Sequence, residues 1–149
     1  MIAVRRAGPT DAASVAEVYL ASFHAAVPTV RLVHTDAQVR RWIRDVVIPD
    51  TETWVAVDGH EIVGMLSLRP GWVEHLYVAP DRRGEGIGRR LLDLAKLRSG
   101  GPLDLWTFQV NKQARRFYEA NGFVALELTD GAENEEREPD VRYRWEPSI

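Results

Sequence analysis

One stretch of twenty residues, from position 73 to position 92, constrains the fold of this chain more than any other. It reads VEHLYVAPDRRGEGIGRRLL: an apolar run, then a basic turn with glycines at alternate positions, then a helical apolar stripe. In this order the first amides of the helix have no intrahelical partner and can point at an anion, while the glycines let a ligand approach the backbone. Four arginines surround the turn: Arg82, Arg83, Arg89 and Arg90. The stretch therefore predicts a site for a phosphorylated ligand.

The glycine spacing argues against the two common nucleotide motifs. Gly84, Gly86 and Gly88 alternate, so the third glycine of the fingerprint G-x-G-x-x-G is missing, and no Lys-Ser or Lys-Thr follows as in a triphosphate loop. The run from Arg83 to Gly88 instead closely resembles the R-x-x-G-x-G acyl-CoA pyrophosphate motif of the GNAT superfamily of N-acetyltransferases. Residues 76–80 resemble the cofactor strand of the same family.

A second block of sequence strengthens this resemblance. Residues 103–111, residues 114–118 and the sequence Asn121-Gly122-Phe123 resemble the strand, helix and terminal Gly-Phe that follow the cofactor motif in that superfamily. Two blocks in the expected order indicate the fold and the cofactor, but they say almost nothing about the acceptor.

Periodicity and turn residues predict the element order β-α-α-β-β-β-α-β-α-β-β. Strands are expected at residues 2–6, 53–57, 61–68, 72–78, 103–108, 123–128 and 141–145. Asp11 is expected to cap the first helix, and the second helix, from Thr35 or Asp36, is expected to end before Pro49. A cofactor helix after Gly86 and a helix capped by Asn111 complete the set.

This order matches the GNAT fold over essentially the whole chain, and it implies an α/β fold with a mixed, mostly antiparallel seven-stranded sheet and about four flanking helices. We expect one N-acetyltransferase domain over residues 1–149. The strands on either side of the cofactor helix should be parallel, with a right-handed crossover. In the family these two strands splay apart, which implies that the pantetheine arm lies in the gap.

Composition limits the other functions that the chain can have. A net charge of −3 and a pI near 5.8 argue against a general nucleic-acid binder. No apolar run is long enough to span a bilayer, and the N-terminus lacks the apolar core of a secretion signal, so we expect a cytoplasmic protein without membrane partners. The absence of cysteine excludes a cysteine-bound acyl intermediate. The acidic run at residues 127–140 is interpreted as a solvated loop or, less simply, as a negative field that attracts a cationic substrate.

The resemblance implies which residues contact acetyl-CoA, the expected co-substrate, and it implies no metal. Main-chain groups of three strand residues should bind the pantetheine arm, a backbone N–H near Leu76 should meet the carbonyl oxygen, and the glycine turn should hold the pyrophosphate. Asn111 resembles the family's cofactor-contacting asparagine, although capping a helix explains it equally well. The predicted cofactor-binding residues are Leu76, Tyr77, Val78, Arg83, Gly84, Glu85, Gly86, Ile87, Gly88, Arg89 and Asn111.

The predicted catalytic residues are Tyr118 and Glu74. Tyr118 matches the family's tyrosine that donates to the thiolate of coenzyme A. The alternative interpretation is that Tyr118 is only an aromatic residue of the hydrophobic core. Glu74 lies where several members carry a base or a carboxylate that holds a water, and either Glu74 or its neighbour His75 is expected to face the acceptor, because adjacent strand residues alternate. Other candidates for acceptor contact are His24, His34 and Trp42.

The function that the resemblance implies is transfer of an acetyl group from acetyl-CoA to an amine by direct attack. The acceptor is expected to be a small molecule or a peptide or protein amino group. Dimerisation through the last strands is frequent in the family, so the resemblance also implies a homodimer. The alternative is a noncatalytic acyl-CoA-binding sensor or regulatory module, which would have no need for a proton donor at Tyr118.

Overall fold

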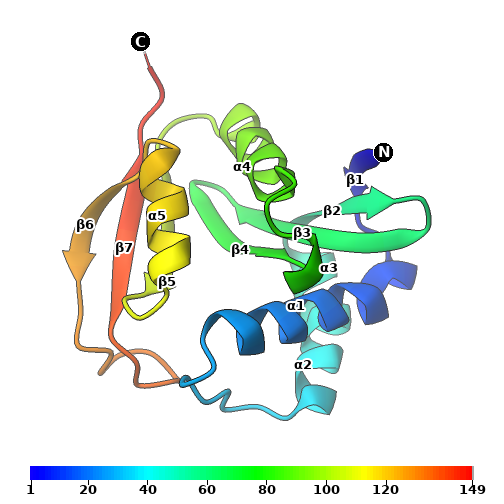
Figure 1. Ribbon diagram of the computed structural model, residues 1–149, viewed down its shortest axis with the longest axis horizontal. Coiled ribbons are helices and arrows are strands. Elements are labelled where there is room, and N and C mark those ends of the chain that lie inside the picture. Colours follow the sequence, from blue (N-terminus) through cyan, green and yellow to red (C-terminus); the bar gives the residue numbers. More distant parts are fainter. Residues whose placement is uncertain (149) are drawn as a thin grey trace.

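The computed structural model describes residues 1–148, and its seven strands form one sheet in the order β1-β2-β3-β4-β5-β7-β6 (Figure 1). The strands are β1 (Ile2–Arg6), β2 (Glu52–Asp58), β3 (Glu61–Arg69), β4 (Trp72–Val78), β5 (Leu103–Phe108), β6 (Val124–Leu128) and β7 (Asp140–Trp145). The helices are η1 (Pro9–Asp11), α1 (Ala12–Ala26), α2 (Asp36–Trp42), η2 (Ile43–Val47), α3 (Ile48–Asp50), η3 (Pro80–Arg82), α4 (Ile87–Arg98) and α5 (Lys112–Ala120). The predicted element order and mixed sheet are confirmed. Within residues 1–148, no helix has the length and apolar character needed to cross a bilayer.

Two hydrophobic cores lie on opposite faces of the sheet. One packs α4 and α5 against the sheet, and its centre includes Leu91, Leu92 and Tyr143, all with 0% exposure. The other packs α1 and the helical segment from α2 onward against β2 and β3. Gly64 of β3 lets α4 approach closely, because a Cβ there would lie 3.1 Å from Ile87 Cγ2. The cofactor helix is thus held directly against the centre of the sheet.

The parallel pair β4 and β5 divides the sheet into two halves. Every other neighbouring pair of strands is antiparallel with several paired residues, whereas β4 and β5 pair only at Trp72 and Asp104. Figure 1 shows the two strands diverging beyond this pair, with α4 making the connection between them. The predicted splay of these strands is therefore present, and it positions the candidate site.

The second helix does not end before Pro49, and this part of the prediction was wrong. The turn η2 has π geometry, in which the Ile48 N–H bonds the Ile43 carbonyl five residues earlier. The widened turn carries the helical path past Pro49, whose missing N–H falls in the first turn of α3. Thr51 N–H then bonds the Val47 carbonyl at 3.1 Å, and the helix ends there.

Asp11 precedes α1, as predicted, but its side chain does not cap that helix. Its carboxylate accepts hydrogen bonds from the Gly8 amide at 2.8 Å and from two Arg5 nitrogens at 2.8 and 3.0 Å. The Arg5 hydrogen bonds lower the pKa of Asp11 below its usual value. Asp11 therefore closes the single turn η1 and ties it to β1.

Candidate active site

The divergence of β4 and β5 opens a cavity of about 880 Å³. Its lining comes from α1, β4, the glycine turn, β5, α5 and the loop of residues 129–139 between β6 and β7. The site is thus built from segments that are far apart in the sequence, and both halves of the sheet contribute to it.

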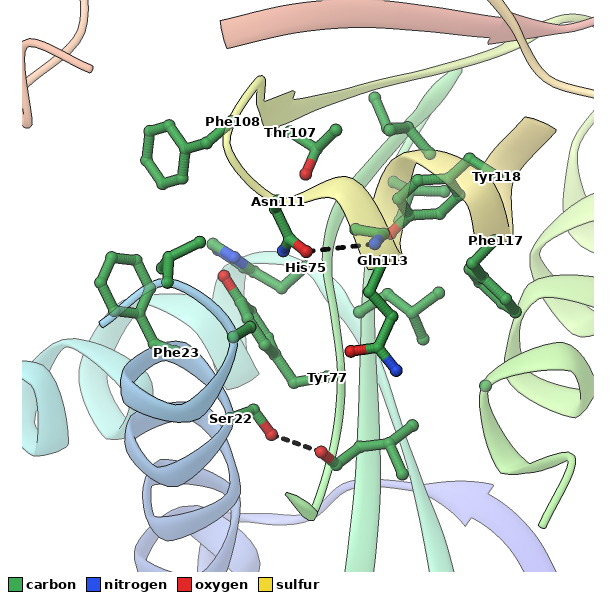
Figure 2. Close-up of a pocket in the computed structure, with 18 of the residues that line it drawn as sticks. Ser22, Phe23, His75, Tyr77, Thr107, Phe108, Asn111, Gln113, Phe117 and Tyr118 are labelled. Carbon is green, nitrogen blue, oxygen red and sulfur yellow. Dashed lines mark hydrogen bonds between the residues drawn. The ribbon is translucent and has the colours of Figure 1, made fainter. Parts of the chain in front are cut away.

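The exposed edge of β4 presents main-chain groups to this cavity. Ala79 N–H donates to the Val63 carbonyl at 2.8 Å, which fixes the direction of the hydrogen-bond ladder to β3. Because that direction alternates along an antiparallel strand, the N–H and carbonyl groups of Leu76 and Val78 point away from β3 and into the gap. In agreement, Ser22 Oγ of α1 donates to the Val78 carbonyl at 2.5 Å (Figure 2). The Leu76 N–H therefore faces the cavity.

Tyr77 contributes to the cavity with its side chain rather than with its backbone. It lies opposite Met65 in the ladder, and the same alternation directs its main-chain groups to β3. Its ring packs against Tyr19 of α1, with centroids 4.8 Å apart. The prediction that Tyr77 offers main-chain groups to a ligand is therefore corrected, because in this ladder only the main-chain groups of its neighbours Leu76 and Val78 point away from β3.

The turn before α4 has the backbone shape that an anion site needs. Gly84 and Gly86 both have φ of +80°, and the space beside each is open to at least 4 Å. No side chain caps α4, and its first backbone hydrogen bond runs from Arg90 N–H to the Gly86 carbonyl. The amides of Ile87, Gly88 and Arg89 thus lack helical partners. These amides and the positive-φ glycines form a concave surface that suits phosphate oxygens.

The charged side chains of the turn divide into two groups. Arg82 bonds Asp58 at 2.7 Å and the Glu85 carboxylate at 3.0 and 3.1 Å, which lowers the pKa of Glu85. The Glu85 carboxylate is therefore turned onto Arg82, and Glu85 does not line the cavity with its side chain. In contrast, Arg83 lines the cavity and has no ion pair within residues 1–148, and Arg89 is exposed with its nearest carboxylate 4.0 Å away.

Two further predicted residues, Ile87 and Asn111, are held in place by contacts within the protein. The Ile87 side chain is 2% exposed and belongs to the core beneath the turn, so only its amide faces the site. Asn111 Oδ1 accepts a hydrogen bond from the Ala114 amide at 3.1 Å and caps α5 (Figure 2). The structure therefore supports the capping interpretation of Asn111, while its amide nitrogen remains beside the cavity.

Tyr118 lies on α5 with its ring in the core and its hydroxyl at the cavity (Figure 2). It is 8% exposed, and the rings of Phe117 and Phe123 lie 5.3 and 5.6 Å away. Within residues 1–148 its hydroxyl has no hydrogen-bond partner, yet no buried side-chain polar atom of these residues is unsatisfied, so the hydroxyl is open to the cavity. Burial raises the pKa of Tyr118 well above its usual value, and the phenol stays protonated at neutral pH.

A β-bulge places Glu74 and His75 differently from a regular strand. Ser67 pairs with His75 and Leu68 pairs with Val73, so Glu74 is the extra residue. Both Glu74 and His75 line the large cavity and also a second cavity of about 70 Å³. Glu74 lies 3.6 Å from Arg69 in an ion pair. The expected assignment of the two side chains to opposite faces does not hold, because the bulge interrupts the alternation.

His75 packs among aromatic rings and is held neutral. Trp42 and Tyr19 lie edge-on to it at 5.1 and 5.7 Å, and Tyr77 stacks on it at 6.4 Å. Burial, together with the charge of Arg69, lowers the pKa of His75 to about 4. At neutral pH its imidazole is therefore unprotonated.

Replacement of His75 by Phe is expected to make the protein less sensitive to acid. Because the folded-state pKa of His75 is about 4, below its unfolded value of 6.5, protonation favours the unfolded chain and stability falls as the pH drops from 6.5 to 4. The difference in the free energy of unfolding is about 2.5 kcal/mol at pH 4.5 and negligible at pH 7. Urea unfolding at both values measures it, with His24→Gln on the exposed face of α1 as the control. If wild type and His75→Phe lost the same free energy of unfolding between pH 7 and pH 4.5, His75 would not be the group that makes the protein sensitive to acid.

The three remaining candidates for acceptor contact do not line the large cavity. His24 is exposed on α1. His34 Nε2 lies 3.2 Å from Glu135 Oε2, so it joins the α1–α2 connection to the β6–β7 loop. Trp42 lies behind His75 and lines the smaller cavity. Their roles toward an acceptor stay predictions.

The structure also brings residues to the cavity that the sequence analysis did not single out. Tyr19 and Phe23 of α1 line one wall, and Glu133 and Glu136 of the β6–β7 loop line another. Helical spacing identified the first two only as core positions. The acidic run was a signal for the other two, but their position depends on how that loop returns over the gap.

Comparison with known proteins identifies the family. The family model described as "Acetyltransferase (GNAT) domain" matches residues 49–125, more than half of the chain. The chain therefore belongs to the GNAT acetyltransferase family.

Several curated relatives match this chain over part of its length. The peptidyl-lysine N-acetyltransferase YjaB of Salmonella typhimurium is 38% identical over 77 residues, which cover 51% of this chain and 52% of that protein. The peptidyl-lysine N-acetyltransferase YiaC of Escherichia coli is 30% identical over 82 residues, which cover 54% of this chain and 56% of that protein. The chain thus matches about half the length of these curated relatives.

Solved structures resemble the whole fold. The solution structure of apo-form YjaB from Escherichia coli has a TM-score of 0.81 at 23% identity and covers 97% of both chains. The crystal structure of the PaiA N-acetyltransferase of Thermoplasma acidophilum in complex with coenzyme A has a TM-score of 0.70 at 20% identity and covers 99% of both chains. These similarities show the fold.

Proposed function

We propose that this chain is a single N-acetyltransferase domain over residues 1–149 that moves an acetyl group from acetyl-CoA to a primary amine of a peptide or small molecule. The observation that carries the proposal is the cavity between β4 and β5, where the free Leu76 N–H and the unpartnered Tyr118 hydroxyl are open to the same space. The names of the YjaB and YiaC relatives, peptidyl-lysine N-acetyltransferases, support an amine acceptor. A noncatalytic acyl-CoA sensor is not favoured, since it needs no phenol there. Cytoplasmic location and homodimerisation stay predictions.

The residues around the cavity fit acetyl-CoA, which when bound supplies an acyl group activated as a thioester. The unpaired amides of Ile87, Gly88 and Arg89 and the guanidinium of Arg83 would hold the pyrophosphate. The free edge of β4 would bind the amide groups of the pantetheine arm as an added strand does. Glu85 would take part through its backbone, because Arg82 holds its carboxylate.

The Leu76 N–H is suited to stabilise charge on the reacting carbonyl. The amine nitrogen forms a bond to the carbonyl carbon, the carbonyl oxygen gains negative charge, and the carbon–sulfur bond then breaks. A fixed backbone donor aimed at the reacting carbonyl stabilises such charge without reorganisation. The rigid pairing of β4 with β3 fixes the direction of this N–H.

The acceptor nitrogen must lose a proton, and Glu74 and His75 are the side chains that could accept or relay it. An alkylammonium of pKa about 10.4 costs roughly 4.6 kcal/mol to deprotonate at pH 7. His75 is unprotonated and can accept a hydrogen bond in the large cavity. Because both residues also line the smaller cavity, we propose that the proton leaves past His75 toward Glu74 and solvent. Glu74 then acts at the outer end of this path, where Arg69 holds it.

Tyr118 is suited to stabilise the departing sulfur. A thiol of pKa near 8.5 is a stronger acid than a phenol, so complete proton transfer from Tyr118 to the thiolate is unfavourable. The phenol instead donates a hydrogen bond to sulfur as negative charge develops there. Over the whole reaction, the acceptor nitrogen loses one proton and the thiolate of coenzyme A gains one, so the number of protons does not change.

Acetyl-CoA is expected to raise the melting temperature of the purified protein, since a ligand that binds only the folded state stabilises it. Coenzyme A should act similarly, whereas NAD and ATP should have no effect, because the glycine spacing does not match their motifs. Release of thiol from acetyl-CoA in the presence of a lysine-containing peptide then tests transfer. Stabilisation by NAD or ATP alone, or by none of the ligands, would rule out the proposed function.

A further inference from the structure

Glu136 lies in the β6–β7 loop, where it is half-buried at the wall of the large cavity, unlike the exposed Glu133 of the same wall. Glu135 pairs with His34, and Asp140 accepts hydrogen bonds from Thr129 and from Asn134. Glu136 is half-buried, lines the large cavity and makes no ion pair or hydrogen bond within residues 1–148. A partly buried carboxylate without a partner is costly, so a cationic ligand that supplies one binds favourably.

Two tyrosines line the same cavity as this carboxylate. Tyr19 is 8% exposed, its ring lies 4.8 Å from that of Tyr77, and both line the cavity. Within residues 1–148 neither hydroxyl has a hydrogen-bond partner outside this pair. Burial first, and then the negative charge of Glu136, raises the pKa of Tyr19 to about 12. The charge of the Glu136 carboxylate therefore acts on both tyrosine hydroxyls, and the three residues line one cavity with groups that suit an ammonium or guanidinium group.

This space and Tyr118 are contributed by different elements around the cavity. Tyr118 belongs to α5 and packs against Phe117 and Phe123. Glu136, Tyr19 and Tyr77 belong to the β6–β7 loop, α1 and β4. If sulfur departs beside Tyr118, a charge bound at Glu136 belongs to a part of the acceptor remote from the reacting nitrogen.

We propose that Glu136, with the hydroxyls of Tyr19 and Tyr77, binds a second positive charge on the acceptor, so that the preferred acceptors are amines that carry another cationic group. This inference rests on the proposed function, which supplies the reacting amine. It defines the acceptor by its chemistry: a diamine, or a lysine with a neighbouring basic residue. Glu133, an exposed residue that also lines the cavity, adds negative charge there.

The first experiment measures binding without turnover. Calorimetric titration of the protein saturated with coenzyme A compares 1,4-diaminobutane with n-butylamine, which lacks the second charge. An ion pair with hydrogen bonds contributes about 1.5–3 kcal/mol, so wild type should bind the diamine at least roughly tenfold more tightly. Glu136→Gln should remove this preference. Glu138→Gln, the same change in the same loop but outside the cavity lining, should retain it.

The second experiment measures kcat/KM for acetylation of the same two amines and of two lysine peptides, with arginine or alanine two positions after the lysine. Preference for the diamine alone identifies small diamines, and preference for the arginine peptide identifies basic peptides. Equal binding of the two amines, or a preference that survives Glu136→Gln, overturns the inference. Selective binding without any acetylated product supports the cation site and refutes the proposed function, so the two failures are distinct.

Discussion

Gly86→Glu is expected to abolish acetyl-CoA binding while leaving the protein folded. Gly86 has φ of +80° and open space beside it, so the new side chain projects into the region where the α4 amides face the phosphates. The carboxylate repels the pyrophosphate, and residues with a Cβ disfavour this backbone conformation by about 1–2 kcal/mol. Loss of two charge-assisted hydrogen bonds, at about 1.5 kcal/mol each, already weakens binding by roughly 100-fold. Calorimetric titration with acetyl-CoA measures the effect.

Gly59→Glu provides the matched control. Gly59 has φ of +62° in the turn between β2 and β3, and a Cβ there also meets nothing within 4 Å. Both variants should lose a similar amount of stability in thermal unfolding without ligand, because the strain is the same. Only Gly59→Glu should keep stabilisation by acetyl-CoA. Normal acetyl-CoA affinity in a folded Gly86→Glu protein would remove the assignment of the turn as the pyrophosphate site.

Local signals in the sequence predicted the parts of the site that depend on the conformation of a few residues. The alternate glycines predicted the turn before α4, and two of them adopt positive φ. Asn111 predicted the start of α5 because a side-chain oxygen can accept from an amide in the first turn, and it does so. The tight turn between β3 and β4 predicted their antiparallel pairing. Each of these features is decided within about ten residues of chain.

Features that depend on distant contacts could not be read from the sequence. The bulge at Glu74 is a property of how β4 meets β3, and it changes which side chains reach the cavity. Pro49 signals a helix end locally, but packing of Ile43 and Val47 in the second core accompanies a π turn that passes it. The position of Glu136 depends on a loop more than a hundred residues from Tyr19. Such contacts determine which residues of α1 and the β6–β7 loop line the cavity where the acceptor would bind. This explains why the cofactor could be predicted from the sequence and the acceptor could not.

Tyr118→Phe is expected to lower kcat by roughly 100-fold while leaving acetyl-CoA affinity within about twofold of wild type, since loss of one hydrogen-bond donor to developing negative charge costs roughly 10²–10³-fold in kcat. The hydroxyl has no protein partner within residues 1–148, so its removal breaks no internal hydrogen bond and the ring keeps its core contacts. Steady-state kinetics with a lysine peptide and a calorimetric titration with acetyl-CoA separate the two effects. A phenylalanine variant with an unchanged kcat would show that Tyr118 is only a core aromatic.

Tyr143→Phe tests whether the fall in kcat of Tyr118→Phe comes from the position of the Tyr118 hydroxyl or merely from the removal of any buried tyrosine hydroxyl. The Tyr143 hydroxyl donates to Glu119 at 2.6 Å and accepts from Arg115 at 3.0 Å, and Tyr143 does not line the cavity. Its loss should therefore cost stability, about 1–3 kcal/mol from two broken hydrogen bonds, with little change in kcat. Tyr118→Phe should do the reverse, because its hydroxyl faces the cavity and contributes nothing to internal bonding. Only a hydroxyl that acts on the reacting groups gives this opposite pattern, since both tyrosines lie in the same core and lose the same atom.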